Sequence, residues 1–419
     1  MTSDTRTLSA CLARYAGLLH AWVGDRHHVA SPLGAWLLLA LAAPAAGGAD
    51  RTTLAGVLGC DPGTAARLAA RLLARPHPLV ASAAAVWTWP GAPLVPGFRA
   101  WQAGLPGTVQ VGDLPGQREL DAWAREHTLG LIDRFPLIVN PGYLVLATAL
   151  ATRVSWATPF DLAPAGELGA GSGWSRQLGQ VLRTPARAPG HAQFIAITPE
   201  AGDVIVHLAL ARDGLLVASV AADPGVSYGD VLAIAQRIAG TCAVTDPGLS
   251  GRGELAGDPR RLLADLPLGE APLWRVREEM SHDGSQDRCT AVLPAWSARS
   301  RIALDDPGLG FGAAAHALAG PGPWRAAQAA MARYTRVGFE AGAVTALAVA
   351  LSMRPRERRR VAELRFAHPY AVVAVAVDPA LIAPGGTRTA PSPWHGVPVF
   401  SAWVAEPQDA TDDEPATAP

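Results

Sequence analysis

The sequence predicts an α+β protein with helices in the first third of the chain and strands in most of the rest. Three observations support this class. Apolar residues make up 49% of the 419 residues and charged residues 17%, which is enough apolar material for a large core. Amphipathic periodicity is concentrated in the first third, whereas small and β-branched runs dominate later. The strand-like runs do not alternate regularly with helices, so repeated βαβ units are not expected.

The first third contains the expected helices. Residues 1–28 combine scattered charges with short apolar runs, which is typical of an amphipathic helix and not of a signal peptide. Val29–Ala49 carries no charge, but its dense apolar part, Leu33–Ala46, is too short to span a bilayer and predicts a buried helix. Arg51–Gly59 predicts a short helix that ends at the glycine. Glu119–Arg134 predicts an amphipathic helix with Leu120, Trp123 and Leu131 on one side.

Strands are expected in the runs rich in small, β-branched and aromatic residues. These runs are Leu79–Thr88, Leu144–Ser155, Ala192–Ala222 (two or three strands), Trp274–Leu304, Met331–Leu351, Ala371–Val377 and Gly396–Val404. Beyond them, residues 408–419 are acidic and proline-rich, which predicts a disordered tail. Residues 1–407 are expected to form a single domain with large mixed and antiparallel sheets.

Composition narrows the classes of function. A net charge of -1 argues against a nucleic-acid surface and against a polybasic membrane face. No residue pattern predicts a catalytic set, a metal site or a cofactor, so the protein is not expected to be an enzyme. A polar turn is favoured over a metal site for the group His282, Asp283, Asp287 and Cys289. The adjacent pair His27 and His28 is expected at the surface.

The four cysteines are Cys11, Cys60, Cys242 and Cys289, and none belongs to a Cys-x-x-Cys pair. Neither a zinc knuckle nor a redox motif is therefore predicted. Buried free thiols are favoured, and one or two disulfides remain possible.

Six segments occur in an order that resembles the serpins, a family of large metastable protease inhibitors. They are SPLGAWLLLALAAPAAGGADRTTLAGVLG, ASAAAVWTWPGAPLVPGFR, AWAREHTLGLIDRFP, LVLATALATRVSWATPF, LRFAHPYAVVAVAV and PVFSAWVAEP. They are spread over nearly the whole chain, from Ser31 to Pro407. The resemblance assigns structural roles to Ser31, Trp156, Phe160 and Pro369. It also implies an exposed reactive-centre loop near the C-terminus, at about residues 341–363.

The resemblance implies that this loop is bait for a serine protease and that its first part inserts into the main sheet after cleavage. The family's spacing places the cleaved bond at Arg356–Glu357, with Arg354, Arg358 and Arg359 as alternative bait residues. An arginine there suits a trypsin-like protease, and the basic run also resembles a site for dibasic-cleaving proteases. The implied hinge of the loop consists of Glu340, Gly342, Ala343, Val344, Thr345, Ala346 and Leu347.

The chain departs from the inhibitory pattern at two places. The hinge has Ala343, Val344 and Leu347 where inhibitors have Thr or Ser followed by small residues. Under the sheet, Gly34, Thr148 and Ala332 replace a Ser, an Asn and a His of the family. A non-inhibitory binding module or cleavable substrate with the same fold therefore stays open. We expect a monomer. Its location stays open, because the lack of an evident signal peptide predicts a cytoplasmic protein whereas the resemblance implies an extracellular one.

Overall fold

The computed structural model describes residues 3–77, 80–91, 94–140, 142, 144–152, 155–185, 189–212, 214–246, 249, 259–281, 287–338, 357–382 and 391–412. The helices are α1 (Ser3–Val23), α2 (Pro32–Ala42), α3 (Gly48–Leu58), α4 (Pro62–Leu73), α5 (Phe98–Ala103), α6 (Gln117–His127), α7 (Tyr228–Thr245), α8 (Phe311–Ala319) and α9 (Pro379–Ile382). Helices cluster in the first third, as predicted. None of those in the described residues combines the length and hydropathy that a membrane span requires.

The strands follow mainly in the second half of the chain. They are β1 (His28–Ala30), β2 (Ala81–Thr88), β3 (Val109–Asp113), β4 (Leu144–Ala151), β5 (Asp161–Pro164), β6 (Gln180–Arg183), β7 (His191–Thr198), β8 (Gly202–Ala211), β9 (Leu215–Ala221), β10 (Gly269–Glu270), β11 (Trp274–Ser281), β12 (Arg288–Leu293), β13 (Trp296–Ala303), β14 (Ala327–Tyr334), β15 (Glu357–Arg365), β16 (Tyr370–Ala376) and β17 (Val397–Val404).

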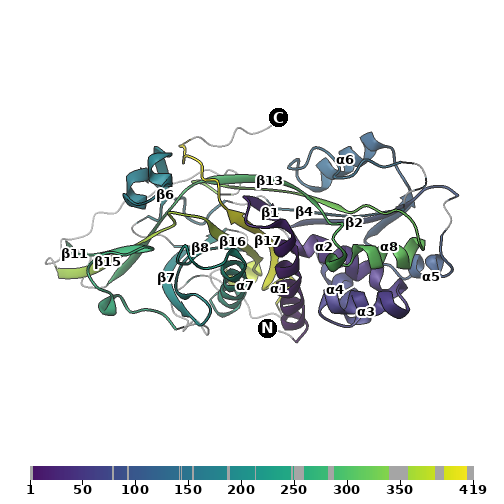
Figure 1. Cartoon of the computed structure of the whole chain (residues 1–419), viewed down its shortest axis with the longest axis horizontal. Coiled ribbons are helices and arrows are strands. Elements are labelled where there is room, and N and C mark those ends of the chain that lie inside the picture. The colour runs from purple at the N-terminus through teal and green to yellow at the C-terminus, as the bar shows by residue number, and fades with distance from the viewer. Residues whose placement is uncertain are drawn as a thin grey trace.

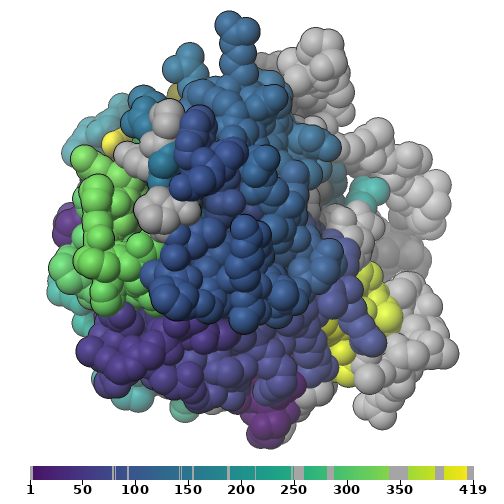
Figure 2. Space-filling view, turned by 90° about the vertical axis from the view of Figure 1, so that its right-hand side faces the viewer, coloured from purple at the N-terminus to yellow at the C-terminus, as the bar shows by residue number. Residues whose placement is uncertain are grey.

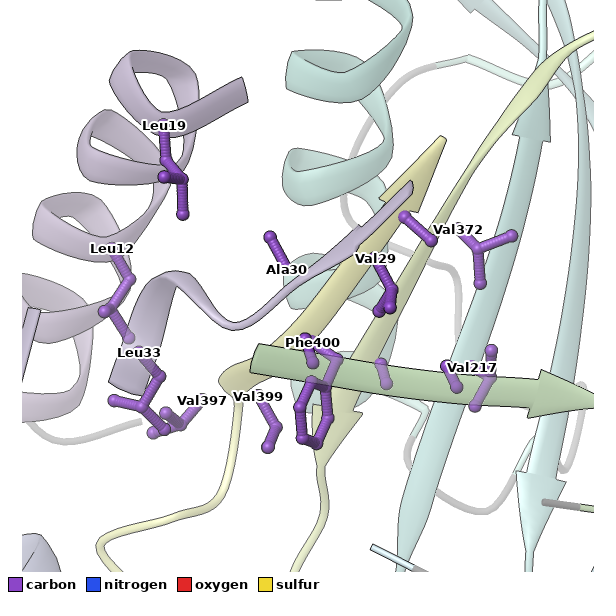
Figure 3. Packing of buried hydrophobic residues seen from close by; sticks show 14 of the residues in the cluster. Leu12, Leu19, Val29, Ala30, Leu33, Val217, Val372, Val397, Val399 and Phe400 are labelled. Atoms are coloured by element: carbon purple, nitrogen blue, oxygen red, sulfur yellow. The ribbon is translucent and has the colours of Figure 1, made fainter. Parts of the chain in front are cut away.

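A six-stranded sheet in the order β1-β17-β16-β9-β8-β7 forms the centre of the molecule. All its pairs are antiparallel, and β9, β16 and β17 are buried along their whole length. One face packs against α7, which explains why these strands consist of uninterrupted apolar runs. The other face joins a core made by α1, α2 and the long strands (Figure 3), where Leu12, Leu33 and Val399 converge.

Two smaller sheets run across the top of Figure 1. One has the order β3-β2-β4 and the other consists of β13 and β14, which form an antiparallel pair. Helix α6 lies above them in this view, and α2 to α5 and α8 lie below. Among the described residues no ladder joins β4 to β14. A further six-stranded sheet, in the order β10-β11-β15-β12-β6-β5, occupies the other end of the molecule.

The structure confirms most of the predicted elements and corrects three boundaries. Helix α6 ends at His127, seven residues before the predicted Arg134, because Leu129 and Gly130 adopt φ of 54° and 77°. The Thr128 hydroxyl then accepts a hydrogen bond from the Ile132 amide and stabilises the turn. Strand β14 starts at Ala327, four residues before the predicted Met331, and ends at Tyr334. Residues 339–351 of that prediction lie outside the described residues.

The predicted disordered tail is the third correction. Gln408 forms a bridge with Ala295, and Ala410 is only 3% exposed. Asp409 accepts hydrogen bonds from the Gly179 and Gln180 amides at 2.6 and 2.9 Å. Composition alone misses this packing because the chain supplies partners for the polar groups of a short acidic segment. Residues 413–419 lie outside the described residues.

Candidate functional site

The structure describes both flanks of the predicted bait loop, whereas the middle of the loop lies outside the described residues. Residues 339–356 are outside them, and this range includes the predicted hinge and two predicted bait residues, Arg354 and Arg356. The hinge residues concerned are Glu340, Gly342, Ala343, Val344, Thr345, Ala346 and Leu347. Glu357, Arg358 and Arg359 are described and open strand β15.

The N-terminal flank of the loop is held by two aromatic residues that the sequence predicted to be structural. The backbone amides of Trp156 and Phe160 donate to the carbonyls of Val337 and Arg336, at 3.1 and 2.9 Å. The Trp156 indole also donates to the Thr335 carbonyl at 3.0 Å, and both aromatic side chains are 1% exposed. The backbone after β14 is therefore fixed as far as Gly338, where the described segment ends.

The C-terminal flank of the loop is a strand that is paired from its first residue. Glu357–Arg360 pair with β11 in antiparallel register. Arg359 binds Glu279 at 2.5 Å, its side chain is 12% exposed, and the hydrogen bond holds the pKa of the Glu279 carboxyl below its usual value. The Arg360 guanidinium donates to three carbonyls, those of Leu263, Ala264 and Leu266. Of the predicted bait residues in this strand, Arg358 is exposed, at 73%, and Arg359 is not.

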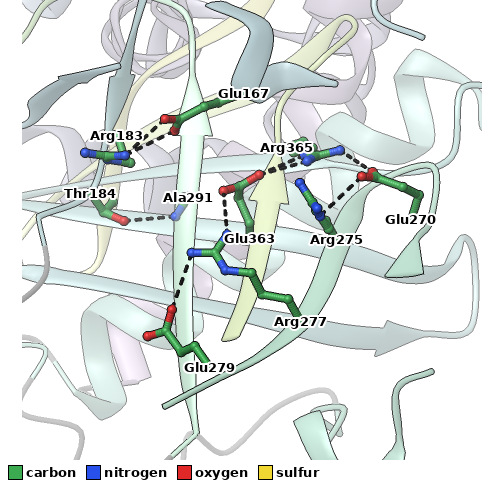
Figure 4. A network of polar contacts seen from close by, with 10 residues as sticks. All are labelled: Glu167, Arg183, Thr184, Glu270, Arg275, Arg277, Glu279, Ala291, Glu363 and Arg365. Carbon is green, nitrogen blue, oxygen red and sulfur yellow. Dashed lines mark hydrogen bonds and ion pairs between the residues drawn. The ribbon is translucent and has the colours of Figure 1, made fainter. Parts of the chain in front are cut away.

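An ionic network continues this restraint along β15 (Figure 4). Arg365 is 7% exposed and binds Glu363 through Nε and Nη2 at 3.0 and 2.9 Å, and it also binds Glu270. Arg277 approaches Glu363 from β11 at 3.6 Å and reaches Glu279 at the same distance. Each buried charge has a partner, so the network holds β15 in its sheet without an uncompensated ion.

A cavity of about 250 Å³ lies between strands β4 and β14. Residues 144–150 line one side and residues 325–329 the other. Gly34 and Leu38 of α2 reach it from below the strands, and Trp123 and Thr128 reach it from α6 and the turn that follows. The cavity therefore passes between the facing edges of two separate sheets. Figure 2 shows this end of the molecule, where the segment with α6 (blue) lies above the N-terminal helices (purple) and beside the segment with α8 (green).

The polar contacts under the cavity differ from the Ser, Asn and His contacts that the resemblance implies. Ser31 caps α2 by accepting from the Gly34 amide at 3.2 Å and donates to the Val399 carbonyl at 2.9 Å. Thr148 on β4 donates to the Gly34 carbonyl at 2.9 Å. Gln328 on β14 binds both the amide and the carbonyl of Ser31 at 2.8 Å. The sequence alone does not single out Gln328, because its only signal is one amide side chain in an alanine-rich strand.

Three other predictions concern Pro369, the histidine pair and the polar group near Asp287. Pro369 is an exposed residue just before β16. His28 is buried, contrary to the prediction, because its ring bonds to His20, which lies on α1. Residues 282–286 lie outside the described residues, and Asp287 accepts a hydrogen bond from the Arg360 amide. Within the described part of the chain, no group of three or more potential metal ligands comes together.

Comparisons with known proteins agree with this architecture. No family model matches the sequence. A curated relative from Oryza sativa subsp. japonica, "Putative serpin-Z5", is 34% identical over 159 residues, which are 33% of this chain and 35% of the relative. The chain thus spans about a third of the length of the curated relative that it matches.

Three solved structures are similar over nearly the whole chain. The thermophilic serpin tengpin in its native state matches with a TM-score of 0.62 and 12% identity, over 97% of this chain and 95% of tengpin. Human thyroxine-binding globulin with thyroxine bound matches with a TM-score of 0.60 and 13% identity, over 97% and 100%. Serpin48 of the insect Tenebrio molitor matches with a TM-score of 0.58 and 13% identity, over 96% and 99%. The chain therefore has the serpin fold, and the curated relative supports the resemblance of its sequence to the serpins.

Proposed function

We propose that this protein inhibits a trypsin-like serine protease by the trapping reaction that its family resemblance implies. Arg356 is the bait residue, and the protease attacks the Arg356–Glu357 bond. The protease serine forms an acyl bond with the Arg356 carbonyl while Glu357 leaves as a new N-terminus. The loop then inserts between β4 and β14 and carries the acylated protease with it.

The observation that carries this proposal is the pair of facing edges at β4 and β14. In the part of the chain that the structure describes, both strands end their sheets and a cavity separates them. Each strand is tied to the N-terminus of α2 by one side chain, Thr148 or Gln328. An extended segment entering there can add main-chain hydrogen bonds to both edges. Alternation places Leu347, Val349, Leu351 and Met353 on one face of such a strand. Their burial would supply about 6–12 kcal/mol.

The position at which β15 begins supports Arg356 as the bait residue. Glu357 is the first residue of the strand, whereas Arg359 and Arg360 are bound by their side chains. A protease needs an extended segment that is free on both edges, so cleavage on the N-terminal side of Glu357 is favoured over cleavage within β15. The arginine side chain suits a specificity pocket that holds a carboxylate.

The test is to incubate the intact protein with trypsin and to resolve the products on a denaturing gel. We expect a complex that survives SDS, and a released C-terminal fragment that begins at Glu357 by mass spectrometry. Arg356→Ala should abolish the complex, whereas the matched control Arg358→Ala should retain it. Cleavage after Arg356 without any complex would reject the inhibitory proposal.

A non-inhibitory function is the second candidate, and the hinge residues favour it. Val344 and Leu347 stand where inhibitors carry small residues, and overfilling a tight slot costs about 1–3 kcal/mol. When that cost is added to the activation barrier, it slows insertion of the loop by about one or two powers of ten. Thyroxine-binding globulin, one of the structural neighbours, is solved with thyroxine bound. Restoring small residues with Val344→Ala and Leu347→Ala should turn a cleaved substrate into a complex-forming inhibitor if the hinge alone is limiting.

A further inference from the structure

The segment that follows β17 crosses the junction between two sheets. Strand β12 ends at Leu293 in the sheet that contains β15, and β13 begins at Trp296 and pairs with β14. Gln408 forms a bridge with Ala295, which lies between β12 and β13, and its amide donates to the Ala295 carbonyl at 2.7 Å. The Ser297 hydroxyl on β13 also donates to the side-chain oxygen of Gln408 at 3.0 Å. The segment is therefore fixed at the point where the two sheets meet.

The next residues of the segment bind the start of β6. The amides of Gly179 and Gln180 donate to the Asp409 carboxylate at 2.6 and 2.9 Å. The Ala410 amide donates to the Gln180 carbonyl at 3.1 Å, and Ala410 is only 3% exposed. Figure 1 shows the end of the described chain (yellow) beside β6 and the start of β13. Residues 408–410 thus bind two different sheets at once.

These contacts connect the two sheets that hold the ends of the predicted bait loop. Strand β6 pairs with β12, and β12 pairs with β15, which forms the C-terminal flank of the loop. Strand β13 pairs with β14, and the N-terminal flank follows β14. In that flank, the Arg336 guanidinium lies 3.4 Å from the Asp412 carboxylate. One short segment therefore spans both anchors of the loop.

We propose that residues 408–412 form a C-terminal latch that fixes the β13–β14 sheet to the sheet that contains β6 and β15. In the described part of the chain, the hydrogen bonds of the latch go to β6, Ala295 and Ser297, and not to β2 or β4. The latch makes β14 the stationary side of the cavity between β4 and β14, so this cavity widens by movement of β2, β3 and β4. Only the use of that widening for loop insertion rests on the proposed function.

Hydrogen–deuterium exchange of the uncleaved protein, followed by mass spectrometry, tests the latch. Asp409→Ala removes the acceptor of two amides from an exposed position, so this variant is expected to fold. Amide exchange should rise by about two- to tenfold in β13, β14 and β15 and should stay unchanged in β2 and β4. The amides of Trp156 and Phe160, which donate to carbonyls of the N-terminal flank, should also exchange faster.

Two truncations and a conservative variant provide the controls. A chain that ends at Pro407 lacks the latch and should show the same pattern with larger increases. A chain that ends at Asp412 keeps the latch and should match the full chain. Asp409→Asn keeps an oxygen that accepts from the Gly179 and Gln180 amides, so it should retain most of the protection.

Three results would overturn the proposal. Faster exchange that is limited to Gly179 and Gln180 would mean that the segment only covers the start of β6. An equal rise in every sheet would mean that the segment supports global stability and does not couple two particular sheets. Unchanged exchange in both Asp409→Ala and the chain that ends at Pro407 would mean that the contacts restrain nothing. Because the measurement involves no protease, its outcome is independent of whether the protein traps one.

Discussion

Acid should destabilise this fold because two histidine pairs are buried as neutral rings. His20 Nδ1 lies 2.7 Å from His28 Nε2, and His191 Nδ1 lies 3.0 Å from His207 Nε2. The carbonyls of Arg26 and Thr158 accept from the outer nitrogens of His28 and His191, so each pair shares a single hydrogen between its rings. Burial lowers the pKa of His20 to about 3 and the pKa of His207 well below its ordinary value.

The sign and the size of the effect follow from linkage. An unfolded histidine has a pKa of about 6.5, and these folded pKa values lie below it, so the unfolded state binds more protons as the pH falls. Stability is therefore complete above pH 6.5 and is lost below it. Between pH 7.5 and 5.5, each histidine that stays neutral in the fold costs about 1.4 kcal/mol. His20 and His207 together cost about 2.7 kcal/mol, and His28 and His191, whose pKa values burial also lowers, bring the total to roughly 3–5 kcal/mol.

The assay is urea unfolding at pH 7.5, 6.5 and 5.5 at constant ionic strength. The free energy of unfolding should fall by at least the amount given above, because burial also lowers the pKa of His77, His368 and His395. His207→Gln should show a shallower dependence on pH, whatever its absolute stability. Phe160→Leu serves as the control, because it weakens the contact with the His207 ring without removing a titrating group. Equal stability at pH 7.5 and 5.5, or an unchanged slope in His207→Gln, would refute the reasoning.

Three substitutions test individual contacts of the fold, each measured by chemical denaturation. Gln328→Ala leaves the Ser31 backbone without two hydrogen bonds and should cost about 1–3 kcal/mol, whereas Gln102→Ala should stay within about 0.5 kcal/mol; equal losses would contradict the role of Gln328. Arg365→Met leaves Glu363 buried beside one weaker ion pair and should cost about 3–5 kcal/mol, and adding Glu363→Met should restore part of that loss. Gly214→Ala would place a Cβ 2.3 Å from the Val377 carbonyl at a φ of +99° and should cost more than the strain term of about 1–3 kcal/mol. Gly202→Ala, with a φ of +66° and open space, should cost only that strain, and equal costs at the two glycines would argue against the contact.

The sequence predicted elements whose stability depends on local pattern. The charge-free segment after Ser31 forms the buried helix α2, and the predicted apolar runs after residue 190 form β7, β8, β9, β16 and β17. The end of α6 was predicted wrongly because it depends on the backbone of a single residue. Leu129 adopts the left-handed conformation, which leucine rarely adopts. Such a conformation depends on tertiary packing around the turn, which no local pattern reports.

Only the site residues that belong to the family's sequence motifs could be predicted. Trp156 and Phe160, which the family motif marks as structural, bind the backbone that follows β14, and Ser31 caps α2. The contact of Gln328 with Ser31 joins residues almost three hundred positions apart, and no spacing rule connects them. The burial of His28 likewise depends on His20 and, through it, on Ser401 at the other end of the chain.

The pairing of β1 with β17 has a consequence for how the chain is made. Val29 lies opposite Ala402, so β1 cannot pair until β17 has been synthesised. At about 5–20 residues per second, translation from one strand to the other takes roughly 20–75 s. During that time the central sheet, which shares a core with α1 and α2, is incomplete, so part of the apolar surface of these helices stays exposed and nascent chains should depend on chaperones until β17 is made.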